Sequence, residues 1–76
     1  MANKEKKIKK RSIMLYGHRT SISIEDEFWV FLRKIARQSK ISIYELIERI
    51  DKERADTNLS SSIRLFCFNL ALKVNQ

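Results

Sequence analysis

The sequence has 76 residues, and its 16 basic and 9 acidic side chains give a net charge of +7. Its single cysteine, Cys67, excludes an internal disulfide. His18 and Cys67 are too far apart in the sequence to suggest a metal site. No apolar run reaches the roughly 18 residues that span a bilayer. A chain this short has a marginal core, so we expect it to gain stability by self-association. We expect no cofactor. We expect the protein to act in the cytoplasm or on the nucleoid.

The first segment, residues 1–11, is strongly basic. It holds six basic residues and one acidic residue, whereas the rest of the chain is nearly balanced. Such a segment is expected to be a disordered tail, with the folded domain over residues 12–76. Its charge suits contact with nucleic-acid phosphates.

Residues 18–24 alternate between apolar and polar side chains, with β-branched residues on the apolar face. A period of two with one apolar face predicts a half-buried strand. The apolar face carries Ile22 and Ile24, and the polar face carries Arg19, Ser21 and Ser23.

Three helices are predicted to follow, over residues 25–39, 42–54 and 60–73. The first begins with acidic residues, which suit the positive end of a helix dipole. The second begins at Ser42, and Glu45 completes a capping box. The third is apolar on most of its faces, which indicates that a partner chain covers part of it.

A single short strand has no sheet to join, and its backbone groups need partners. The same strand of a second copy, antiparallel across a two-fold axis, would supply them. We therefore expect a mainly α fold with one strand per chain, as an intertwined homodimer with an intermolecular antiparallel ribbon. The residues expected in the dimer core are Ile22, Ile24, Phe28, Leu32, Ile47 and Phe66.

A second arrangement is compatible with the same residues. Tyr16 to Arg19 could form a tight turn of type II′, because a glycine lies within it. Residues 12–16 would then pair with residues 20–24 inside one chain. That hairpin would permit a stable monomer.

Residues 19–28, 32–36 and 41–47 together resemble the ribbon-helix-helix repressor family. The chain is most similar to a short bacterial branch, because it carries Gly-His-Arg-Thr-Ser-Ile-Ser at 17–23 and Asn-Leu-Ser-Ser at 58–61. The resemblance implies an intertwined dimer, double-stranded DNA as the partner, and transcriptional regulation, usually repression. The third helix departs from the minimal family plan, which ends after two helices, and leaves room for a higher oligomer on DNA or a protein partner.

The predicted base-reading residues are Arg19, Ser21 and Ser23, because a β-ribbon presents its polar face to the major groove. The start of the second helix suits a phosphate, which is also what the resemblance implies. The predicted phosphate contacts are Lys40, Ser42, Ile43, Lys9, Lys10, Arg11 and His18.

An enzyme is not expected, because the sequence holds no phosphate-binding glycine loop and no paired catalytic groups. The alternative function is a protein-interaction module, such as an antitoxin or an adaptor, that uses the third helix.

Overall fold

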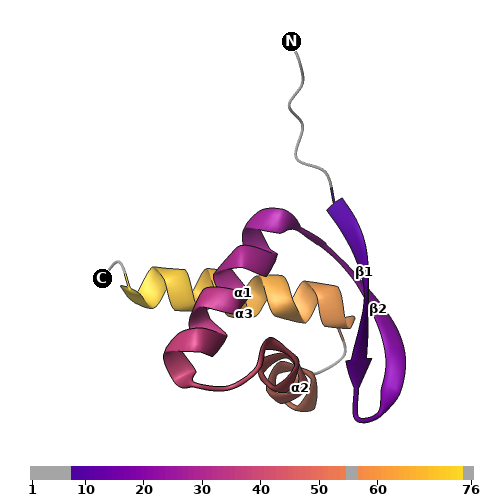
Figure 1. Cartoon of the computed structure of the whole chain (residues 1–76). Coiled ribbons are helices and arrows are strands. Elements are labelled where there is room, and N and C mark those ends of the chain that lie inside the picture. The colour runs from indigo at the N-terminus through magenta and orange to yellow at the C-terminus, as the bar shows by residue number, and fades with distance from the viewer. Residues whose placement is uncertain (1–7, 55–56, 75–76) are drawn as a thin grey trace.

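A two-stranded antiparallel sheet and three helices make up the described part of the chain. The computed structural model describes residues 8–54 and 57–74. The helices lie together on one side of the hairpin (Figure 1). The elements in chain order are β1 (Ile8–Leu15), β2 (His18–Glu25), α1 (Asp26–Ser39), α2 (Ile43–Glu53) and α3 (Leu59–Val74).

The ribbon is formed within one chain. β1 pairs with β2 along the full length of both strands, from Ile8 opposite Glu25 to Leu15 opposite His18. The expectation of one strand per chain is therefore wrong, and the hairpin considered as the alternative is the observed arrangement. Its pairing is longer than the expected pairing of 12–16 with 20–24 and differs from it in register, because Tyr16 lies in the turn and Ser12 is opposite Ser21.

Residues 8–11 correct a second expectation, because they are the first half of β1 and not part of a tail. Their alternation is hidden in the sequence, since the helix-facing positions hold Lys9 and Arg11 in place of apolar residues. Residues 1–7, the rest of the predicted tail, lie outside the described residues.

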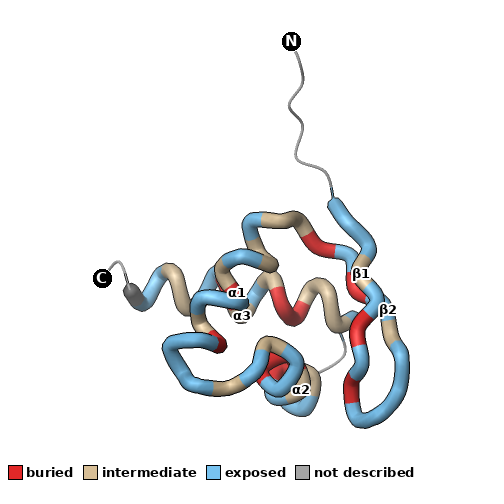
Figure 2. Tube along the Cα trace, in the orientation of Figure 1, coloured by how far each residue is buried: buried red, intermediate tan, exposed pale blue. Residues whose placement is uncertain are grey.

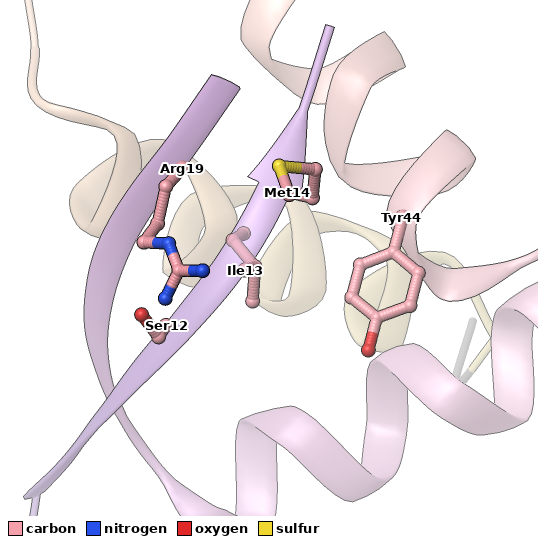
Figure 3. A pocket seen from close by; sticks show the side chains of 5 residues that line it. All are labelled: Ser12, Ile13, Met14, Arg19 and Tyr44. Atoms are coloured by element: carbon pink, nitrogen blue, oxygen red, sulfur yellow. The ribbon is translucent and has the colours of Figure 1, made fainter. Parts of the chain in front are cut away.

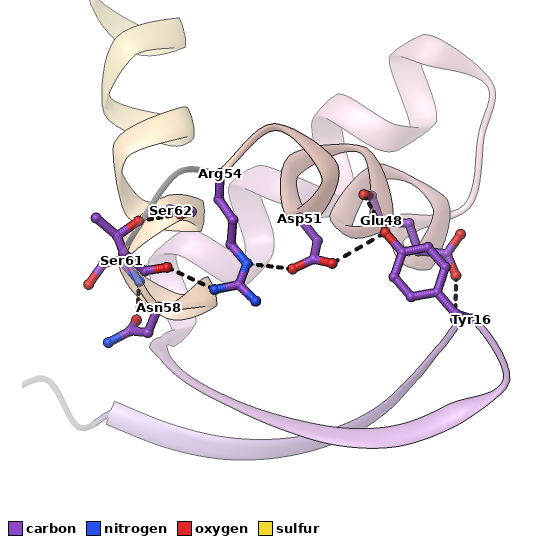
Figure 4. A network of polar contacts seen from close by, with 8 residues as sticks. Tyr16, Glu48, Asp51, Arg54, Asn58, Ser61 and Ser62 are labelled. Atoms are coloured by element: carbon purple, nitrogen blue, oxygen red, sulfur yellow. Dashed lines mark hydrogen bonds and ion pairs between the residues drawn. The ribbon is translucent and has the colours of Figure 1, made fainter.

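The hairpin turn has both central residues at positive φ, 54° for Tyr16 and 79° for Gly17. Two positive φ values define a type I′ turn, whose twist matches that of the strands, and not the expected type II′. Contacts with α2 hold Tyr16 in this conformation (Figure 4). Its N–H donates to Oε2 of Glu48 at 2.9 Å, and its hydroxyl lies 3.0 Å from the carbonyl oxygen of Glu48 and 3.3 Å from Oδ2 of Asp51.

Each helix lies within one residue of its predicted range, because its ends carry strong local signals. Oγ of Ser42 accepts a hydrogen bond from the N–H of Glu45 at 3.0 Å, as the predicted cap requires. Oδ1 of Asn58 accepts from the N–H of Ser61 at 2.8 Å and caps α3 in the same way. No helix in the described ranges is long and apolar enough to cross a membrane.

The core lies between the hairpin and the helices (Figure 2). Of the residues expected in a dimer core, four are buried by a single chain, with at most 1% of their surface exposed: Ile22, Ile24, Leu32 and Ile47. Phe28 and Phe66 are partly buried against them. The helix α3 packs on β2, α1 and α2 and closes the core of the single chain.

Candidate nucleic-acid interface

The outward face of the hairpin is the candidate interface. Directly opposite residues of antiparallel strands share a face. The register therefore places three alternate side chains of each strand on the side away from the helices, and these six side chains are all exposed. The opposite pairs are Lys10 with Ser23, Ser12 with Ser21, and Met14 with Arg19.

These three pairs contain two cations and no acid. The outward face is therefore polar and positive over the part that the three pairs cover. Glu25 lies beyond them, at the end of β2, opposite Ile8.

The structure places Arg19, Ser21 and Ser23 where the sequence predicted them, on an exposed polar face. Their contact with bases stays a prediction. Ser12 and Met14 lie beside them on the same face and were not predicted as part of it. Residues 13–15 are all apolar and do not alternate, so the available signal was the glycine at position 17, which allows a turn that pairs residues 8–15 with β2.

A groove joins this face to the start of α2. It has a volume of about 350 Å³ and is lined by Ser12, Ile13, Met14, Arg19 and Tyr44. Figure 3 shows Arg19 reaching from β2 toward Ser12 on β1, with Tyr44 on α2 at the other side of Met14. The start of α2 therefore lies beside the outward face of the hairpin.

The start of α2 has free backbone donors. The cap satisfies the N–H of Glu45, while the N–H groups of Ile43 and Tyr44 have no partner in the described part of the chain. Ser42 is exposed, and so is Lys40, two residues earlier at the left-handed end of α1. The predicted phosphate-binding residues of this turn, Lys40, Ser42 and Ile43, therefore form one local group.

Lys9 and Arg11 lie on the other face of the hairpin, toward α1. Nη2 of Arg11 is 2.6 Å from Oδ1 of Asp26, and Nζ of Lys9 is 3.2 Å from Oδ2 of the same carboxylate. The guanidinium of Arg11 also stacks on Trp29, with its central carbon 4.4 Å from the ring centroid. These contacts place both cations on the opposite face of the hairpin from Lys10. Contact of the three residues with phosphate stays a prediction.

His18 is exposed and lies at the turn, opposite Leu15 on the helix-facing side. It is therefore near the tip of the hairpin and apart from the three outward pairs.

The edge of β2 that does not face β1 is covered by α3 near Ser23. The N–H of Ser23 donates to Oγ of Ser60 at 3.1 Å, and Nη2 of Arg64 donates to the carbonyl oxygen of Ser23 at 3.1 Å. Nε of Arg64 also pairs with Oε1 of Glu25 at 3.0 Å. Because β1 occupies the other edge, a second β2 could pair here only by displacing β1 or α3.

The described residues hold no group of three or more metal-ligating side chains. The lone thiol is buried in the core, and burial raises the pKa of Cys67 to about 11. A protonated, covered thiol is a poor nucleophile.

Comparison with known proteins identifies the family. A family model described as a ribbon-helix-helix domain matches residues 8–71, which include both strands, α1, α2 and most of α3. Neither the curated proteins nor the solved structures give a match. The chain belongs to the ribbon-helix-helix domain family, whose members are generally DNA-binding regulators.

Proposed function

We propose that this protein is a sequence-specific DNA-binding transcriptional regulator, acting as a repressor, and that its hairpin enters the major groove. The observation that carries the proposal is the outward face of the hairpin, where Lys10 and Arg19 stand among three serines with no acid between them. A positive face suits a polyanion, and the serine hydroxyls can donate to or accept from base edges.

The dimensions of the hairpin fit this role. Its two strands are about 4.8 Å apart, and the major groove, which is about 12 Å wide, admits a two-stranded ribbon. Arg19 would donate two hydrogen bonds to O6 and N7 of a guanine. Ser21 and Ser23 would contact neighbouring bases, with Ser23 held in place by the contacts of its backbone with α3.

The phosphate contacts would come from the start of α2. The free N–H groups there and the positive end of the helix dipole favour an anion. Lys40, Ser42 and Ile43 would bind one backbone phosphate while the hairpin reads the adjacent bases. The groove between the hairpin and Tyr44 supports these two roles, because it is lined by residues of the hairpin and of the start of α2, which therefore lie on one side of the molecule.

The test is a selection of bound duplexes from a random pool, repeated at two salt concentrations, followed by affinity measurements on variants. Arg19→Ala should weaken binding to the selected duplex by about 5- to 150-fold, since a bidentate arginine–guanine contact contributes about 1–3 kcal/mol. Arg33→Ala is the matched control, because Arg33 is exposed on α1 and outside the proposed interface. Binding without any preferred motif, or equal affinities for the two variants, would refute base reading.

A protein-binding role is the second candidate, and one surface favours it. Leu65, Phe68 and Leu72 of α3 are spaced at i, i+3 and i+7 and are 53%, 58% and 48% exposed. An apolar groove of about 260 Å³ beside them is lined by residues of α1 and α3, including Phe31 and Ala71.

The two roles are separable by mutation. Arg19→Ala should weaken binding to the selected duplex and leave a complex formed through α3 intact. Phe68→Asp should abolish that complex, whether the partner is another protein or a second copy of the chain. The homodimer expected of this family is part of the proposal. Because β1 pairs with one edge of β2 and α3 covers the other edge at Ser23, we expect a second copy to bind through the α3 stripe.

A further inference from the structure

The two strands of this ribbon have different sequences, unlike the strands of a ribbon built from two identical chains. Two-fold symmetry would present one row of side chains twice. Here β1 presents Lys10, Ser12 and Met14, while β2 presents a different row that begins with Arg19. The outward face is therefore asymmetric within a single chain.

A single chain also completes this face. β1 fills one edge of β2, and Ser60 and Arg64 bind the backbone of Ser23 at the other edge. No second copy is needed to build the ribbon, so the asymmetry is kept when the protein binds a partner.

Met14 is the apolar side chain among the three outward pairs, in the pair nearest the turn. It is 51% exposed, whereas its neighbours Ile13 and Leu15 are each 5% exposed. It lies opposite Arg19 and faces the groove that ends at Tyr44. An exposed, flexible thioether next to Arg19 can pack on an apolar group, and the 5-methyl group of thymine is the apolar feature of the major groove.

We propose that one chain reads an asymmetric DNA sequence with both strands of its hairpin, and that Met14 is a specificity-determining residue that packs on a thymine methyl beside the base pair read by Arg19. The inference rests on the proposed function. Successive outward pairs are two residues, or about 6.8 Å, apart along the strands, which is roughly two base-pair steps. The three pairs therefore cover about four or five base pairs.

The experiment replaces single thymines of the selected duplex by uracil, which removes only the 5-methyl group. At one position next to the essential guanine, this change should weaken binding of the unmodified protein about fourfold, as expected for one buried methyl group. The same change should have no effect on Met14→Ala, because the contact is already lost. This is a double-mutant cycle between protein and DNA.

Ile8→Ala is the matched control. Ile8 lies on the same strand and the same face and is 55% exposed, but it is opposite Glu25, away from Arg19. The Ile8→Ala variant should remain as sensitive to the uracil as the unmodified protein.

The binding motif itself should have no symmetry axis inside the base pairs that one hairpin covers.

The outcomes separate the inference from the proposed function. If binding to the motif depends on Arg19 but uracil weakens it equally for the unmodified protein and for Met14→Ala, the inference alone is overturned. A motif with a symmetry axis inside the region of one hairpin would also overturn it. Failure to select any motif would overturn both the inference and the proposed function.

Discussion

Single residues of the hairpin have roles that depend on which face they occupy. Arg19 and Lys10 are exposed on the outward face, while Lys9 and Arg11 lie on the inner face and share the carboxylate of Asp26. Nε of Arg11 is buried without a hydrogen-bond partner among the described residues, so the carboxylate of Asp26 is the counter-charge of this guanidinium. Of these four basic residues, two therefore lie on the outward face and two form structural contacts with Asp26.

We expect Asp26→Asn to lower the free energy of unfolding by about 1 kcal/mol, because it leaves a partly buried guanidinium without its counter-charge. Urea denaturation would measure the change. The control is Glu45→Gln, which removes an exposed pair with Arg49 whose side chains are 50% and 60% exposed. Equal effects of the two substitutions would contradict a structural role for Arg11.

Cys67 provides a pH-dependent prediction. Burial raises the pKa of its thiol from 9.0 to about 11, so the folded protein keeps a proton that the unfolded chain releases. The raised pKa of Cys67 therefore contributes to the free energy of unfolding. This contribution is complete below pH 9 and is lost as the pH rises toward 11. Denaturation between these pH values should show a steeper loss of stability than in Cys67→Ala.

At neutral pH the same thiol should react slowly with a disulfide reagent in the folded protein and rapidly in urea. A fast reaction without denaturant would show that the thiol is accessible, contrary to the structure.

At the scale of elements, the hairpin turn determines the register of the interface. Tyr16 and Gly17 hold positive φ values, and a shift of one residue in the pairing would move Arg19 to the opposite face. The hydrogen bonds of Tyr16 with α2 fix the turn against the helices, and partial desolvation and the carboxylate of Asp51 raise the pKa of its hydroxyl. The turn thus couples the interface to the core.

Gly17→Ala tests this element. A Cβ at Gly17 would meet no atom within 4 Å, so the substitution is unfavourable only through its φ of 79°. We expect a loss of about 1 kcal/mol in unfolding free energy. Gly17→Asn should cost less, because asparagine adopts positive φ more readily. A Gly17→Ala protein as stable as the original would argue against the type I′ turn.

Local signals made α1, α2 and α3 predictable. A capping serine, acidic first turns and apolar periodicity act within a few residues of the helix they define. The strand β1 was less predictable, because Lys9 and Arg11 occupy positions where the pattern calls for apolar side chains. Their partner, Asp26, is 15 residues from Arg11 in sequence and becomes a neighbour only through folding.

At the scale of the whole molecule, α3 covers the core of the single chain and leaves an apolar stripe on its own outer face. The exposed members of this stripe are Leu65, Phe68 and Leu72. A chain this small with so much exposed apolar surface on one helix suits self-association.

Sedimentation over a range of concentrations would test the stripe. The original protein should dimerise, and Phe68→Asp should shift it toward the monomer, because a carboxylate cannot be buried unpaired in an apolar interface. Val30→Asp is the control, since it adds the same charge at an exposed apolar position of α1, outside the stripe. A protein that is monomeric throughout, or equal effects of both substitutions, would exclude this surface.

The sequence by itself determined the three helices, the polar face of β2 and the membership of a DNA-binding family, because these depend on local periodicity, caps and motif residues. Only the tertiary structure decided that the ribbon is intramolecular, that α3 closes the core and that β1 adds Lys10, Ser12 and Met14 to the interface. Strand pairing and ion pairing join residues that are distant in sequence, so their energies are set by the packed molecule and not by any short segment of the chain.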